Sequence, residues 1–170
     1  MQSFWKWAST NRAVEPHVER NHQMPSTHIT STFHIVFFTK ERRQLIIADW
    51  RPRLHAYMGG IVKGLDTVPL AIGGVADHAH VLAGLKSKHR LDYFVRDLKA
   101  DSSAWVHKEF TRLFEWQKGY GAFSVCGTHI ANVRSYVESQ ETHHQSETFQ
   151  QEYVGLLEKN GVEYAPEYLW

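Results

Sequence analysis

Residues 30–39 read Thr-Ser-Thr-Phe-His-Ile-Val-Phe-Phe-Thr, a run of β-branched and aromatic side chains. This composition is typical of a strand in the middle of a sheet. The charged residues Lys-Glu-Arg-Arg at 40–43 follow directly and end the strand. We therefore take residues 30–39 as a central strand and place the remaining elements relative to it.

The rest of the chain alternates between helical and extended patterns. Apolar stripes at helical spacing predict helices over 46–63 and 91–110, and Gly64 is expected to stop the first. Short apolar runs over 67–75, 78–85 and 120–126 predict strands. Two more helices follow, over 129–140 and around 149–157. The order β-α-β-β-α-β predicts an α+β, ferredoxin-like fold, with an antiparallel sheet, helices on one face and added C-terminal helices.

Length and composition indicate one globular domain. The chain has 170 residues, of which 42% are hydrophobic and 22% charged. Residues 1–25 lack any period and are expected to form a flexible extension, ahead of a main domain over 26–145. Residues 146–170 are expected to form a helix and tail that pack on that domain. With no apolar run of membrane-spanning length, no signal-peptide pattern and a single cysteine, we expect a cytoplasmic protein.

Charge is distributed unevenly along the chain. Residues 28–134 hold 15 Lys and Arg against 9 Asp and Glu, whereas residues 135–170 hold 1 against 7. A basic body with an acidic C-terminal part is compatible with an anion-binding face and a solvated helix, although many proteins that bind no nucleic acid share it.

The sharpest local motif is the pair His78 and His80 within the predicted strand over 78–85. Residues two apart in a strand point to the same side, so the two imidazoles share a face. Two neutral imidazoles at this spacing form half of a divalent metal site. In a chain with 12 histidines a chance pair is also possible, so the interpretation needs support from elsewhere.

Support comes from Tyr136 and Gln140 in the predicted helix over 129–140. Residues four apart share a helix face, so a phenol and an amide project together. The amide oxygen of Gln140 is a candidate third metal ligand, and Tyr136 is a candidate nucleophile for a phosphate held by that metal. The alternative is that Tyr136 only packs and Gln140 faces solvent.

These segments together resemble one family. The strand His-Ile-Val-Phe-Phe-Thr-Lys at 34–40, the histidine pair after Asp77 and the Tyr136-to-Gln140 spacing resemble the single-tyrosine HUH transposases. That family includes insertion-sequence 200/605 enzymes and REP-associated tyrosine transposases. The resemblance covers roughly residues 26–170, including segments 94–103, 116–120 and 141–144. The family's histidine pair usually brackets a bulky hydrophobic residue, where this chain has Ala79.

The resemblance implies a DNA transposase that cleaves and rejoins single-stranded DNA through a 5′-phosphotyrosine bond. It assigns Tyr136 as nucleophile, His78, His80 and Gln140 as metal ligands, and residues 26–145 as the catalytic domain. The implied cofactor is a divalent metal, Mg²⁺ or Mn²⁺. The implied partners are single-stranded DNA with hairpins at element ends and a second copy of the chain, with the tyrosine acting in trans. The implied source is a bacterial or archaeal cytoplasm, with the DNA-bound protein on the nucleoid.

Contacts to DNA are expected from basic, polar and aromatic residues at the ends of the predicted elements. The candidates are Lys40, Arg42, Arg43, Lys86, Lys88, Lys99, Ser102 and Trp116.

Three alternatives remain open from the sequence. One is another HUH enzyme, a replication initiator or relaxase, although such enzymes usually occupy longer chains. The second is a ferredoxin-like nucleic-acid-binding module without catalysis, such as a domesticated copy. The third is a small metallohydrolase that uses His78 and His80 with water and has no need of Tyr136.

Overall fold

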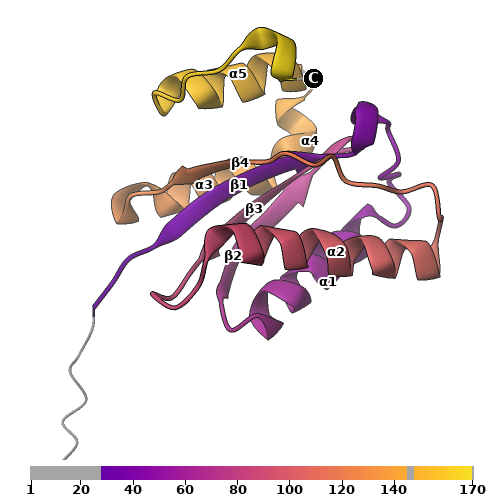
Figure 1. Cartoon of the computed structure of the whole chain (residues 1–170), viewed down its shortest axis with the longest axis horizontal. Helices are drawn as coiled ribbons and strands as arrows, with labels where there is room; N and C mark the ends of the chain where they lie inside the picture. The colour runs from indigo at the N-terminus through magenta and orange to yellow at the C-terminus, as the bar shows by residue number, and fades with distance from the viewer. Residues whose placement is uncertain (1–27, 145–147, 170) are drawn as a thin grey trace, which may run out of the picture.

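The computed structural model describes residues 28–144 and 148–169, so the predicted extension over 1–25 lies outside the described residues. A four-stranded antiparallel sheet in the order β2-β3-β1-β4 forms the centre of the molecule (Figure 1). This order, with the helices described below, confirms the predicted α+β fold with an antiparallel sheet. The strands are β1 (Thr32–Phe38), β2 (Val68–Gly74), β3 (His78–Gly84) and β4 (Gly121–Ser124).

Five α-helices accompany the sheet within the described residues. None of them is long and apolar enough to cross a membrane. The first begins later than the predicted Ile46, because Pro52 occupies its first turn and residues 46–50 form a turn that buries Ile46 and Trp50. The helices are α1 (Arg51–Gly64), α2 (Leu91–Glu109), α3 (Ile130–Glu138), α4 (Gln140–His143) and α5 (Phe149–Lys159), with short 3₁₀ turns at Lys40–Arg42, Gly127–His129 and Pro166–Tyr168.

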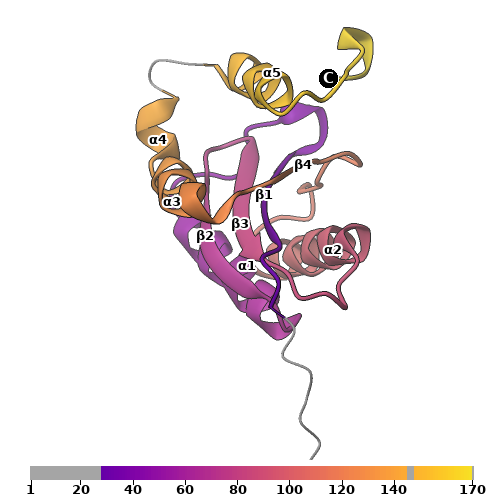
Figure 2. The ribbon, with the colours of Figure 1, turned by 90° about the vertical axis from the view of Figure 1, so that its left-hand side faces the viewer.

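The two faces of the sheet are covered by different helices (Figure 2). Ile35 and Phe37 of β1 belong to a large apolar cluster with α1 and α2. Val36 and Phe38, which point the other way, pack against the apolar side of α5. On that second face α3 also packs on β2 and β3. Helices α1 and α2 thus cover one face as predicted, and the C-terminal helices cover the opposite one.

Strand register fixes where the histidine pair lies. β3 pairs with β1 so that His80 is opposite Val36 and His78 is opposite Phe38. Both histidines therefore sit in one of the two inner strands, toward its N-terminal end, where α4 and α5 approach. The pair is surrounded by protein on all sides and both side chains are fully buried.

The predicted continuous helix over 129–140 is wrong in one respect. Helix α3 ends at Glu138 and α4 begins at Gln140, because the backbone of Ser139 leaves the helical conformation. The amide of Ser139 donates to the carbonyl oxygens of both Ser135 and Tyr136, which tightens the last turn of α3. Serine is a weak residue for a helix interior. The break turns the chain so that Gln140 enters the interior.

Candidate active site

The two β3 histidines are each held by a hydrogen bond on the Nδ1 atom. His78 Nδ1 lies 2.7 Å from Asp77 Oδ1, and His80 Nδ1 lies 2.9 Å from His34 Nε2. Such partners fix the orientation of an imidazole and leave the other nitrogen available as a ligand. The Nε2 atoms of His78 and His80 therefore face the same interior space, as the i and i+2 spacing predicts.

Gln140 reaches this space from α4. Its side chain is buried, and its Oε1 lies 3.5 Å from His78 Nε2. Its Nε2 donates to Tyr136 O over 3.4 Å, so the amide is oriented by the turn that connects α3 to α4. The structure thus brings Gln140 beside the histidine pair although the two segments are 60 residues apart in sequence.

Tyr136 lies on α3 at the edge of the same cluster. Its ring is half-buried, and its centroid is 5.8 Å from the ring centroids of His34 and of His80, in an edge-on arrangement. Its hydroxyl donates a hydrogen bond to Glu152 Oε1 of α5. The phenol oxygen and the imidazoles therefore meet in one chain.

Four residues of this cluster are not predicted from the sequence as site residues. His143 is the last residue of α4, His144 follows it directly, and Glu152 comes from α5. His144 Nε2 lies 3.1 Å from His78 Nε2, from Gln140 Oε1 and from Glu152 Oε2. A sequence signal existed for Glu152, because it is an acid on the apolar side of α5, between Phe149 and Tyr153. The fourth residue, His34, is recognised in the sequence only as part of a strand.

Burial keeps two of these imidazoles neutral. Desolvation lowers the pKa of His34 to about 4. Desolvation, aided by the neighbouring His78, lowers the pKa of His80 well below its usual value. Only a neutral imidazole has the lone pair that binds a metal. The site therefore presents at least one ready donor nitrogen, on His80, at neutral pH.

The donors present suit a divalent cation. Within the described residues, the buried atoms His80 Nε2 and Glu152 Oε2 make no hydrogen bond. His78, His144 and Glu152 each offer a ligand atom within 4.8 Å of the others. Mixed imidazole and oxygen donors are the ligands of first-row divalent metals. The residues thus fit the metal that the sequence motif implies.

A cavity of about 490 Å³ opens between α3 and α5 beside Tyr136. This volume is in the range of ligand-binding pockets. The wall carries polar and basic groups as well as apolar ones. Among the lining residues are His34, His129, Asn132, Tyr136, Glu152 and Lys159.

Three of the residues predicted to contact DNA are in exposed ion pairs. Lys40 lies 2.6 Å from Glu115, and both Lys86 and Lys88 contact Asp66. Arg43 is also exposed. Such surface pairs are weak and leave the cations able to exchange partners.

Arg42 lies closer to the histidine cluster than these lysines. Its guanidinium is 3.4 Å from Asp77, and it also lies over the ring of Phe149. It thus contacts the residue that orients His78.

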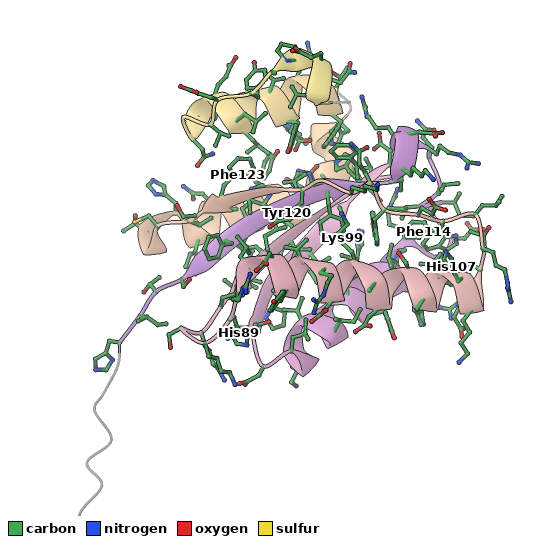
Figure 3. All side chains as sticks on the ribbon, viewed as in Figure 1. His89, Lys99, His107, Phe114, Tyr120 and Phe123 are labelled. Carbon is green, nitrogen blue, oxygen red and sulfur yellow. The ribbon has the colours of Figure 1, made fainter. Side chains whose placement is uncertain are left out.

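The other predicted DNA contacts have structural roles in α2 and the segment before β4. Lys99 donates from α2 to the carbonyls of Gln117 and Gly119, near Tyr120 (Figure 3). Ser102 is fully buried and accepts a hydrogen bond from Trp116 Nε1, 2.9 Å away. The Trp116 ring packs edge-on against Phe37. These positions do not favour direct contact of Ser102 or Trp116 with DNA.

Comparison with known proteins gives consistent results. Residues 27–140 match the family described as "Transposase IS200 like". The transposases for insertion sequence element IS200 of Salmonella typhimurium and Salmonella typhi are each 28% identical to the chain over 115 residues, covering 64% of this chain and 75% of the relative.

Two solved structures share the fold. One is a crystal structure of a protein assigned as a transposase from Deinococcus radiodurans R1, with a TM-score of 0.57, 22% identity, and coverage of 68% of this chain and 94% of that one. The other is a REP-associated tyrosine transposase bound to a REP hairpin, with a TM-score of 0.53, 13% identity, and coverage of 70% and 72%. The sequence match extends from the first strand to Gln140 and so contains the histidine pair, Tyr136 and Gln140. The chain therefore belongs to the family of IS200-like transposases.

Proposed function

We propose that this transposase cleaves and rejoins single-stranded DNA by attack of Tyr136 on a phosphodiester. The observation that carries the proposal is the meeting of the Tyr136 phenol with the buried side chains of His78, His80 and Gln140 at the end of a cavity. A water-using metallohydrolase gives no reason for a tyrosine at this place, which favours the phenol as nucleophile.

The metal would be held by His78, His80 and Gln140. Bound there, Mg²⁺ or Mn²⁺ would draw negative charge from the scissile phosphate and so make it more open to attack. The protein contributes the fixed orientation of its donors, since Asp77 and His34 hold the two imidazoles. Gln140 contributes a neutral oxygen whose position depends on the turn at Ser139.

The covalent step follows from the position of Tyr136. Its phenol oxygen forms a bond to phosphorus, and the bond from phosphorus to the 3′ oxygen of the preceding nucleotide breaks. The phenol loses its proton, and the departing 3′ oxygen gains one. The product is a 5′-phosphotyrosine with a free 3′-hydroxyl. Because a phosphodiester is exchanged for a similar phosphodiester, a 3′-hydroxyl can reverse the step and join DNA without a nucleotide cofactor.

We expect the DNA strand to enter through the cavity between α3 and α5, where His129, Asn132 and Lys159 are available to its phosphates. The related REP-associated transposase was solved with a hairpin, which supports hairpin-bearing single strands as the substrate class. The phenol and the imidazoles come from one chain, which supports attack in cis. The homodimer with attack in trans remains a prediction from the family resemblance.

Covalent trapping tests the proposal. The protein is incubated with labelled single-stranded hairpin DNA and Mn²⁺, denatured, and examined for DNA attached to protein. We expect an adduct with the parent and none with Tyr136→Phe, because the nucleophilic oxygen is removed. We also expect no adduct with His78→Ala or with duplex DNA.

The matched control is Tyr57→Phe, the same chemical change on α1, where Tyr57 stacks on Trp105 far from the cavity. It should form the adduct at the parental level. An adduct that survives Tyr136→Phe would refute the nucleophile. Cleavage without adduct would favour a hydrolase, and DNA binding alone would favour the non-catalytic module.

A further inference from the structure

Helix α5 carries a buried carboxylate into the centre of the active site. Glu152 is 4% exposed, and four imidazoles surround it. Its oxygens lie 3.1 Å from His144 Nε2, 3.5 Å from His80 Nε2, and 3.8 Å from His78 Nε2 and His143 Nε2. No part of the histidine-pair motif or of the Tyr136 spacing requires an acid at this position.

The two oxygens of Glu152 have different surroundings. Oε1 accepts the hydrogen bond of the Tyr136 hydroxyl and another from Gln140 Nε2, 3.1 Å away. Oε2 makes no hydrogen bond within the described residues, yet it faces His78 and His144. Oε1 is thus bonded to the nucleophile and also lies nearest His80 and His143, whereas Oε2 lies nearest His78 and His144.

This arrangement is costly without a cation. A carboxylate removed from water needs a compensating charge or a full set of hydrogen bonds. His80 is also fully buried, and its Nε2 lacks a hydrogen bond within the same part of the chain. A divalent cation among these atoms would satisfy both Glu152 Oε2 and His80 Nε2. Carboxylate oxygen is also the donor that Mg²⁺ and Mn²⁺ prefer.

Local sequence holds Glu152 in this place. Thr148 and Gln151 form a capping box that fixes the first turn of α5, immediately before Glu152. Phe149 and Tyr153, on either side of it, pack on Phe38 of β1. The carboxylate is therefore positioned by a docked helix.

We propose that Glu152 is a ligand of the active-site cation and bridges it to the Tyr136 hydroxyl, with His144 as a further nitrogen donor. The proposal deepens the proposed function, since it takes Tyr136 as the nucleophile. In this arrangement one carboxylate would hold both the cation and the attacking oxygen. It also makes the docking of α5, and hence the C-terminal part of the chain, a requirement for tight metal binding.

Isothermal titration of the full-length, metal-free protein with MnCl₂ tests this inference without DNA. Glu152→Gln keeps the size of the side chain but removes the charge and one ligand oxygen. We expect the dissociation constant for Mn²⁺ to rise at least about tenfold, the range seen when groups that support a metal site are lost. The control Glu158→Gln makes the same change at an exposed position of the same helix and should stay within about twofold of the parent.

A second measurement guards against a folding defect. Mn²⁺ should raise the midpoint of thermal unfolding of the parent and of Glu158→Gln, and raise it much less in Glu152→Gln. If Glu152→Gln does not fold, Glu152→Asp keeps the charge but draws the carboxylate back, and we expect it also to bind Mn²⁺ more weakly than the parent.

If the folded Glu152→Gln and Glu152→Asp variants bind Mn²⁺ as tightly as the parent, Glu152 is not a ligand of the cation and the proposal is refuted. That result, together with a Tyr136 adduct, would leave the proposed function standing. The converse, weakened metal binding in Glu152→Gln but no adduct in the parent, would sustain the ligand and reject the nucleophile.

Discussion

The two faces of the sheet use the same strands for different purposes. On the α1 and α2 side, β3 presents Ala79, Val81 and Ala83 to one continuous apolar cluster. On the α3 and α5 side, the alternate residues of the same strand include His78 and His80, and the apolar contacts are divided into two smaller clusters. Because its apolar cluster is larger, we infer that the α1 and α2 face contributes more of the folding free energy than the opposite face. The other face can then bury imidazoles, an amide and a carboxylate that a bound cation would compensate.

Removing a core side chain on the α1 and α2 face should have the largest effect on stability. Leu98 is fully buried on α2, and Leu98→Ala is expected to lower the free energy of unfolding by about 2–5 kcal/mol. Urea denaturation followed by circular dichroism measures the loss. Because the site lies on the opposite face, the fraction that stays folded should still form the Tyr136 adduct.

The matched control is Leu113→Ala, since Leu113 is 65% exposed and its replacement should cost little. A folded Leu98→Ala protein that forms no adduct would contradict the view that one face stabilises the fold while the other holds the site. It would mean that the core side also sets the geometry of the site.

The face covered by α1 and α2, here called the apolar face, was the part of the fold that the sequence could predict. The β-branched and aromatic composition of residues 30–39 identified a central strand, and the helical stripes identified the buried sides of α1 and α2, because apolar residues in a helix follow a simple period. The break at Ser139 was missed, since no proline or glycine marks it in the sequence. The late start of α1 was also missed, although Pro52 at its first turn was visible in the sequence.

The site was predictable only as far as its motif extends. His78, His80, Tyr136 and Gln140 were identified by spacing and by resemblance, and the structure brings all four together. Glu152 and His144 were not, because their approach depends on how α4 and α5 fold back on the sheet. A stripe of apolar residues interrupted by an acid indicates a buried carboxylate, but the stripe does not indicate its partner.

Acid should weaken the α3 and α5 face through its neutral histidines. The pKa of His34 is lowered by burial to about 4, below its unfolded value of about 6.5. Between these two pKa values, His34 binds a proton in the unfolded chain but not in the folded chain. The contribution of His34 to the free energy of unfolding is fully present above pH 6.5. It decreases by at most about 3 kcal/mol as the pH falls toward 4.

The measurement is urea denaturation of the metal-free protein at several pH values, for the parent and for His34→Phe. At pH 7.5 the difference in free energy of unfolding between the parent and His34→Phe reports the change in packing. Between pH 6.5 and 4 the parent should lose more stability than the variant. Parallel pH profiles would show that His34 does not carry this dependence.

Gly73 in β2 allows α3 to pack closely on the face of the sheet that holds the site. A Cβ at Gly73 would lie 1.9 Å from the carbonyl oxygen of Val137, so α3 rests directly on the strand backbone. Gly73→Ala must push α3 away, at an expected cost of about 1–3 kcal/mol. Gly60→Ala is the control on α1, where a Cβ meets nothing within 4 Å and a helical alanine should stabilise by about 0.5–1 kcal/mol.

Because Tyr136 precedes Val137, adduct formation by folded Gly73→Ala should fall at least tenfold, more than its stability loss explains. Parental adduct formation at 25 °C in that variant would mean that the phenol reaches the imidazoles from more than one position of α3, and that only the apolar face requires close packing.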